Sequence, residues 1–139
     1  MSAALMFLGL IFRSGRVVVG EEACGMEARA RHLKLILTAC DAGRSSLVKA
    51  RSHSEKAACP LCPVPWSKDD LGGMLGRGGT GVIGITDLNM ALAFVQKLDA
   101  EEPGTHASAL EALTAAEEKA KQRKAEEARH RENKKRGRK

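Results

Sequence analysis

The stretch 14–22, SGRVVVGEE, constrains the fold more than any other part of the chain. Its three valines at 17–19 are β-branched and favour an extended strand. Gly20 allows a sharp turn, and the two glutamates after it suit the first turn of a helix, whose amide dipoles favour negative charge. The stretch therefore predicts a strand that passes into a helix through a glycine hinge. The exposed amides of that helix are a place where an anion can bind, although capping by Gly20 alone also accounts for these residues.

The rest of the chain alternates between helical and extended patterns. Uncapped apolar runs at 33–39 and 82–85 predict buried strands. A further extended piece around Val64 is flanked by prolines, which places it at a sheet edge or outside the ladder. Apolar spacing, the capping box of Ser67 and Asp70, and the capping pair Thr86-Asp87 indicate the helices. They are predicted over 3–13, 20–32, 44–58, 67–76 and 88–98. The alternation predicts an α/β fold, a three-layer α-β-α sandwich with a small mixed sheet.

Two helix faces can be assigned from the same spacing. In the second predicted helix Ala23, Met26 and Ala30 share one face, and in the third Leu47, Val48 and Ala57 are expected to point inward; these side chains are predicted to face the core.

Length and charge limit the domain organisation and the partners. A chain of 139 residues has room for one domain of roughly 100 residues and a tail. We predict a domain over 1–100 and a charged tail over 101–139, rich in Ala, Glu, Lys and Arg, that is helical or disordered. A capping box at Ser108 would begin its helix, which has nothing large to bury after Leu113. The 23 Lys and Arg exceed the 17 Asp and Glu by 6, so the chain should attract polyanions such as RNA.

The apolar segment 3–12 bears on location. It is shorter than the roughly 20 residues that cross a bilayer, and it has neither a preceding basic residue nor a small-residue cleavage site after it. We therefore read it as a core helix, expect no membrane partner, and expect a cytoplasmic monomer whose four cysteines are reduced.

Five segments, taken in order, carry a resemblance to a known family. They are LGL (8–10), GRVVVGEE (15–22), LILTACDA (35–42), LGGMLG (71–76) and VIGITD (82–87). Together they resemble the kink-turn-binding ribosomal protein family, the seven-Ae type of the large subunit, and especially its small bacterial members. The resemblance covers about residues 5–98. It implies an α-β-α sandwich that binds a sharply bent RNA helix, as a ribosomal or ribosome-associated protein.

The resemblance also implies an RNA-binding site. In that family the RNA is held by the glycine turn, the helical turn after it and two nearby loops. The matching positions here are Gly20, Glu21, Glu22, Asp41, Ala42, Gly43, Gly78, Gly79, Thr80 and Gly81. The flanking arginines Arg13, Arg16, Arg44 and Arg77 are the expected phosphate contacts. Exposed amides and small residues suit RNA, because they can approach phosphates and the edges of unpaired bases.

The chain departs from the strongest RNA binders of the family after the glycine. Those proteins carry a Thr-Asn-Glu type sequence and then a lysine, where this chain has Glu21, Glu22, Ala23 and Met26. Carboxylates repel phosphates, so affinity for an ordinary kink-turn should be lower. The alternative is a protein-interaction module of the same fold that has lost specific RNA contacts, with nonspecific RNA binding by the basic tail.

Catalytic and metal-binding patterns are weak. Cys59 and Cys62 have the spacing of a zinc half-site or a redox pair, which leaves a zinc or thiol-redox protein as a third hypothesis, but no second pair follows. The glycine run 76–84 lacks the Gly-Lys-Ser/Thr ending of a phosphate loop. The four histidines are scattered, with no identifiable Ser or Cys partner. We expect no enzyme, no metal and no cofactor.

Overall fold

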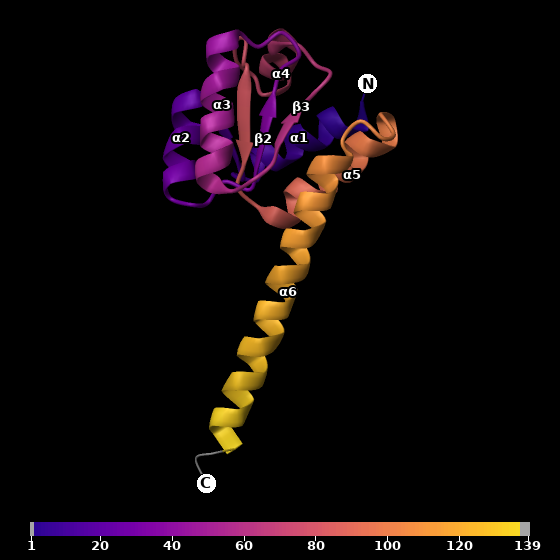
Figure 1. Cartoon of the computed structure of the whole chain (residues 1–139). Coiled ribbons are helices and arrows are strands. Elements are labelled where there is room, and N and C mark those ends of the chain that lie inside the picture. Colours follow the sequence, from indigo (N-terminus) through magenta and orange to yellow (C-terminus); the bar gives the residue numbers. More distant parts are fainter. Residues whose placement is uncertain (1, 137–139) are drawn as a thin grey trace.

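The structure, a computed structural model, describes residues 2–136 and has a mixed α/β fold (Figure 1). Its elements follow one another as α1 (Ala3–Arg13), β1 (Val17–Val19), α2 (Glu21–Arg29), β2 (Leu35–Thr38), α3 (Arg44–Ala57), β3 (Leu61–Pro63), α4 (Lys68–Met74), β4 (Val82–Ile85), α5 (Leu88–Glu101) and α6 (Ala107–Arg136). The predicted α/β class and alternation of elements are confirmed. So are the capping box of Ser67 and Asp70 at α4 and the cap of α5 by Asp87, whose Oδ2 accepts from the Met90 amide.

The four strands form one mixed sheet in the order β1-β4-β2-β3. β4 is antiparallel to both neighbours, with Val82 opposite Thr38 and Ile85 opposite Val17, whereas β3 is parallel to β2. The predicted edge strand therefore exists, over Leu61–Pro63. Because β1 and β2 are both antiparallel to β4, they run in the same direction and end at the same end of the sheet.

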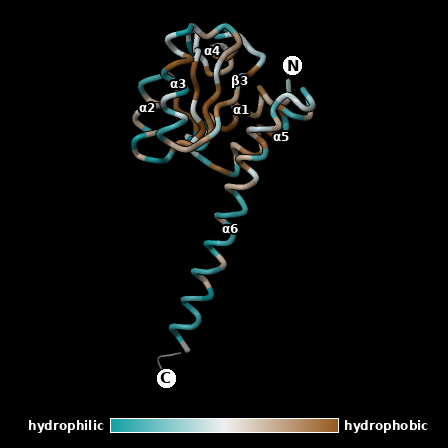
Figure 2. The backbone as a smooth tube through the Cα atoms, in the orientation of Figure 1, coloured by the Kyte–Doolittle hydropathy of each residue, from teal (hydrophilic) through white to brown (hydrophobic). Residues whose placement is uncertain are grey.

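Helices cover both faces of the sheet, as predicted for a three-layer sandwich. On one face α1, α4, α5 and the start of α6 pack over Leu35, Leu37, Ile83 and Ile85. On the other, α2 and α3 pack over Ile36 and its neighbours. Figure 2 shows the hydrophobic segments gathered in the strands between these layers.

The predicted inward faces of α2 and α3 are wrong in part. Met26 is 62% exposed and Val48 is 60% exposed. The buried residues are instead small: Cys24, Gly25 and Ala28 in α2 and Ala50 in α3. Of the other predicted members of these faces, Ala30 and Leu47 are exposed and Ala23 is half-buried, whereas Ala57 packs against the core as predicted. The two helices approach closely, because a Cβ atom on Gly25 would lie 2.8 Å from Cε1 of His53. Such close packing leaves no room for the larger apolar side chains, which lie outside the contact. α2 also ends at Arg29, before the predicted position at 32.

The tail is helical from Ala107 to Arg136, and residues 137–139 lie outside the described chain. The predicted capping box at Ser108 is wrong, because the helix has already begun at Ala107. Ala109 and Leu113 are buried in the main core, so the first turns of α6 belong to it. The domain boundary near residue 100 stays a prediction. Figure 1 shows the rest of α6 projecting away from the body, and Figure 2 shows that part as largely hydrophilic.

Within residues 2–136, no helix is both long enough and apolar enough to cross a membrane.

Candidate nucleic-acid interface

Three chain segments meet at the end of the sheet where β1 and β2 end and β4 begins. The Gly20 amide donates a hydrogen bond to the carbonyl of Val82 (2.9 Å), and the Ala39 amide donates to the carbonyl of Gly81 (2.9 Å). The turn into α2 and the turn into α3 therefore lie on either side of the glycine loop 78–81. This sheet end is where the resemblance placed the RNA-binding site.

A groove of about 810 Å³ lies between these segments. It is lined by Val19, Gly20, Glu21, Glu22, Ala23, Gly43, Ser46, Lys68, Arg77, Gly78, Gly79, Thr80, Gly81 and Val82. The structure thus brings together the predicted glycine turn, Gly43 and the whole predicted glycine loop. Their role in binding RNA stays a prediction.

The groove lies at the N-termini of two helices that both have glycine caps. Gly20 is the N-cap of α2 with φ +97° and ψ 159°, a region that glycine alone occupies readily. Gly43 is the N-cap of α3 with an ordinary φ of −68°. Neither glycine has a side chain that could accept a hydrogen bond from the first amides of its helix. Two partially positive helix ends therefore face the groove, and both favour an anion.

The glycine loop is held against α4 by backbone contacts. The Arg77 amide donates to the Gly72 carbonyl (2.8 Å) and the Thr80 amide to the Lys68 carbonyl (3.0 Å). A Cβ atom on Gly72 would lie 2.1 Å from the carbonyl oxygen of Gly78. Only glycine permits this approach of two backbones. The loop therefore has a fixed position relative to α4.

Lys68 is a groove residue that the sequence reasoning missed. It is the first residue of α4, and its amide donates to Oδ1 of Asp41 (2.8 Å). The predicted residue Asp41 thus ties the loop after β2 to α4. No local pattern indicates a contact between residues so far apart in the chain. With Arg77, Lys68 gives the groove two cationic side chains.

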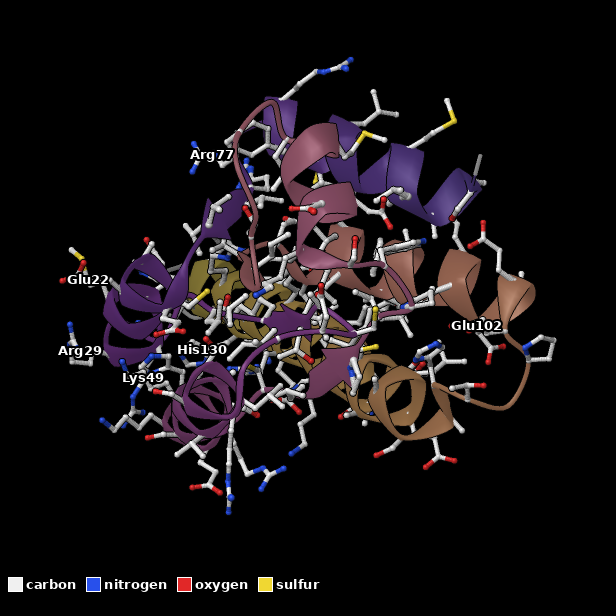
Figure 3. The ribbon with its side chains drawn as sticks, turned by 90° about the horizontal axis from the view of Figure 1, so that it is seen from above. Glu22, Arg29, Lys49, Arg77, Glu102 and His130 are labelled. Atoms are coloured by element: carbon white, nitrogen blue, oxygen red, sulfur yellow. The ribbon has the colours of Figure 1, made fainter. Side chains whose placement is uncertain are left out.

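Glu21 is less of an obstacle to an anion than its sequence position suggests. Its carboxylate accepts a hydrogen bond from the Ser46 hydroxyl and forms an ion pair with Lys49 (3.3 Å). The Ser46 hydrogen bond, with a smaller contribution from Lys49, lowers the pKa of Glu21. Glu21 therefore joins α2 to α3 as an ionised and partly neutralised group. Glu22 is exposed, and Figure 3 shows it at the outer edge of α2.

Arg16 lies at the opposite end of the sheet from the groove. Arg16 precedes β1, whereas Gly20 follows that strand. The two residues are therefore four positions apart in extended chain, which corresponds to roughly 13 Å. Arg16 instead lines a hollow with Lys34, His32 and Thr86.

The remaining predicted residues do not line the groove. Arg44 directly follows the lining residue Gly43, whereas Arg13 ends α1, three residues before Arg16. Ala42 lies behind the glycine loop, 3.7 Å from the position of a Cβ atom on Gly81. The guanidinium of Arg77, which does line the groove, stacks 5.8 Å from the ring centre of Phe12.

The cysteine pair is divided between the two cores, and one histidine contacts a cysteine. Cys62 belongs to the core under α1 and α5, and Cys59 packs against the core under α2 and α3, so the two thiols serve opposite faces of the sheet. No group of three metal-binding side chains occurs in residues 2–136. The expectation that no histidine has a cysteine partner is wrong, because Nδ1 of His106 lies 3.3 Å from Sγ of Cys62. Nε2 of His106 donates to Glu102 Oε1 (2.9 Å).

No family model and no curated protein matches the sequence. Solved structures do share its fold. One is a protein of unknown function from Bacillus halodurans, with a TM-score of 0.65 and 23% identity, over 71% of this chain and 99% of that one. Another is a Giardia lamblia protein described as a 15.5 kD RNA-binding protein, with a TM-score of 0.55 and 17% identity, over 69% of this chain and 84% of that one.

Proposed function

We propose that the chain binds structured RNA of the kink-turn type through the groove between α2, α3 and the glycine loop. The observation that carries the proposal is the meeting of two glycine-capped helix ends, Lys68 and Arg77 in one groove. The net charge of +6 and the RNA-binding description of the Giardia lamblia protein also support it. In this proposal the protein is a non-catalytic monomer of the kink-turn-binding family, associated with the ribosome in the bacterial cytoplasm.

The lining of the groove suits recognition of shape. Five of its fourteen lining residues are glycines, and beside them a phosphate or an unpaired base can come close to amide groups without meeting a side chain. A sharply bent RNA brings its phosphates together and exposes unpaired bases, whereas a straight duplex keeps its bases stacked. A fixed concave surface of amides and two cations should therefore prefer bent RNA.

The charge of the first turn of α2 sets the expected affinity. Glu21 is engaged by Ser46 and Lys49, but Glu22 is exposed and Met26 stands where strong binders have a lysine. Replacing Glu22 by Gln should therefore strengthen RNA binding, because it removes a like charge beside the groove.

The experiment is a titration of the full chain with a kink-turn hairpin and with a straight duplex of equal length, at two salt concentrations. The variants Lys68→Gln and Arg77→Gln test the groove, and Arg51→Gln, an exposed cation of α3 outside the groove, is the control. The wild type should prefer the hairpin. Each groove variant should bind the kink-turn hairpin more weakly, and the salt slope of that binding should fall by about one. Equal binding of both RNAs by every variant would refute the proposal.

A second candidate is a protein-interaction module of the same fold. Exposed apolar side chains on the two helices that border the groove favour it: Met26 is 62%, Leu47 37% and Val48 60% exposed. In that case any RNA binding should come from α6. Replacing Lys134 and Lys135 by Gln would then weaken RNA binding and lower its salt slope by up to about two, and the groove variants would not change it.

A further inference from the structure

The end of the sheet opposite the groove carries a second set of cations. Arg16 precedes β1 and Lys34 precedes β2, and both strands start at this end. The two side chains line one hollow of about 340 Å³. Two cations that are separated in the sequence therefore converge beside the strand starts.

Lys34 also lines a second, adjoining hollow of about 460 Å³ beneath α6. Most of its lining is apolar and includes Leu33, Leu61 and Leu113, and Arg123 of α6 is also among the lining residues. Arg16, Lys34 and Arg123 thus follow one another across two hollows that share Lys34. We call these three residues the basic underside.

The three cations of the basic underside outnumber the carboxylates around them, because Glu27 is the one acidic residue that lines either hollow in the described chain. Within residues 2–136, no ion pair joins Arg16, Lys34 or Arg123 to a carboxylate. Glu27 lines the first hollow, but it pairs with His32 (3.2 Å). Unpaired cations on a concave surface attract a polyanion.

Helix α6 extends this positive surface away from the body. Residues 119–135 hold eight Lys and Arg against three Glu, and they cover roughly 24 Å at 1.5 Å per residue. His130 and Lys134 follow Arg123 at spacings of seven and eleven, which place them on the same side of the helix. The helix keeps this direction because Leu113 is buried and His106 is hydrogen-bonded to Glu102.

We infer that the basic underside and the adjoining side of α6 form a second RNA-binding surface, which contacts the phosphate backbone of a double-helical segment. Single-stranded RNA is usually held by stacking on aromatic side chains. Neither hollow is lined by Phe or Trp in the described chain, because Phe94 belongs to the core under α1 and α5 and Phe7, Phe12 and Trp66 pack against it. The one ring that lines the first hollow, His32, is held by Glu27 (3.2 Å). A surface of cations without stacking groups suits a duplex backbone. This surface is separate from the proposed groove, so one molecule can hold two RNA segments.

The test is a titration of the full chain with a straight RNA duplex at several salt concentrations. The triple variant Arg16→Gln/Lys34→Gln/Arg123→Gln is compared with Arg29→Gln/Arg51→Gln/Lys97→Gln, which removes the same charge from exposed positions outside this surface. The first should weaken duplex binding at least about tenfold and lower the salt slope by about two to three, whereas the second should change both much less. Circular dichroism checks that both variants are folded.

Several outcomes would overturn the inference. Equal weakening by the two triple variants would mean that net charge alone attracts the duplex. An unchanged affinity of the underside variant would mean that these residues do not contact it. If the underside variant lost binding to a polyglutamate peptide but kept its duplex binding, the partner would be an acidic protein.

An additional experiment distinguishes RNA binding by the basic underside from RNA binding by the groove. The double variant Lys68→Gln/Arg77→Gln should keep its duplex affinity, and protein saturated with a kink-turn hairpin should still bind a labelled duplex. If no preference for bent RNA is found but the underside variant still loses duplex binding, the proposed function fails and this inference stands. Competition between the hairpin and the duplex for a single site would overturn the inference instead.

Discussion

Sγ of Cys62 lies 3.3 Å from Nδ1 of His106, and both side chains are buried. Because Nε2 of the same ring donates to Glu102, Nδ1 is left as an acceptor for the thiol hydrogen of Cys62. This chain of hydrogen bonds joins the edge strand β3 to the turn between α5 and α6. It therefore helps to hold α6 on the body.

Replacing His106 by Ala should destabilise the protein by about 2 to 4 kcal/mol, because it leaves a cavity and leaves the buried Cys62 thiol only the more distant Pro63 carbonyl (3.8 Å) as an acceptor. The free energy of unfolding from urea titrations measures the effect. His32→Ala is the matched control, since that ring is 69% exposed and should matter by less than about 1 kcal/mol. Similar values for the two variants would show that the buried contact does not stabilise the fold.

The thiols should differ sharply in reactivity. Cys40 is exposed, whereas burial raises the pKa of Cys24 to about 12 and those of Cys59 and Cys62 to about 11. A thiol reagent at pH 8 should therefore modify one cysteine rapidly and the others only on unfolding. The Cys40→Ser variant should lack the rapid phase. A second rapidly reacting thiol in that variant would contradict the described burial.

The same burial predicts how stability depends on alkaline pH. The folded pKa values lie above the ordinary thiol value of 9.0, so the unfolded chain loses these protons first. The stabilisation is complete below about pH 9 and decreases as the pH rises towards 11. Urea titrations at pH 8 and pH 10 should show a lower free energy of unfolding at pH 10. The Cys40→Ser variant should show the same decrease, because Cys40 is not one of the buried thiols. An equal value at both pH values would exclude this effect.

Two glycine caps allow a matched test of backbone strain. Gly20 has φ +97°, and Gly43 has φ −68°; both are N-caps, and a Cβ atom would meet nothing within 4 Å at either position. Gly20→Ala should lower the free energy of unfolding by about 1 to 3 kcal/mol more than Gly43→Ala, because only Gly20 occupies a region unfavourable to alanine. Equal effects in urea titrations would mean that the turn into α2 does not require this conformation.

Two neighbouring glycines of α4 test how the loop 78–81 is held. A Cβ atom on Gly72 would lie 2.1 Å from the Gly78 carbonyl, whereas one on Gly73 meets nothing within 4 Å. Gly72→Ala should destabilise the protein by at least about 1 to 3 kcal/mol, since one of the two backbones must move. Gly73→Ala should stabilise it by up to about 1 kcal/mol through helix propensity. Thermal unfolding of the two variants should therefore shift in opposite directions, and a common shift would contradict the close contact.

Local sequence signals predicted the elements well, because the interactions concerned are local. The valines of β1, the hinge at Gly20 and the capping box of Ser67 each act within a few residues, and each is found as expected. The large-scale order of strands and helices follows from the same signals. Local pattern thus defines where helices and strands begin, in this chain as in others.

What the sequence could not show depends on contacts between distant residues. Apolar spacing alone gave Met26 an inward direction, but the contact of Gly25 with His53 turns a different side of α2 to the core. Lys68 reaches the groove through Asp41, and His106 reaches Cys62, by pairings that no periodicity indicates. The groove is therefore predictable as a set of loops, and of its two cations Arg77 was predicted from the sequence but Lys68 was not.

The position of β4 in the sheet has a consequence for synthesis on the ribosome. β4 is made last of the described strands, yet it lies between β1 and β2. At about 5 to 20 residues per second, Val19 precedes Val82 by roughly 3 to 13 seconds, during which β1 has no partner strand. A nascent chain must therefore keep an unpaired valine strand from aggregating for that time, which makes early engagement by a chaperone an advantage for this topology.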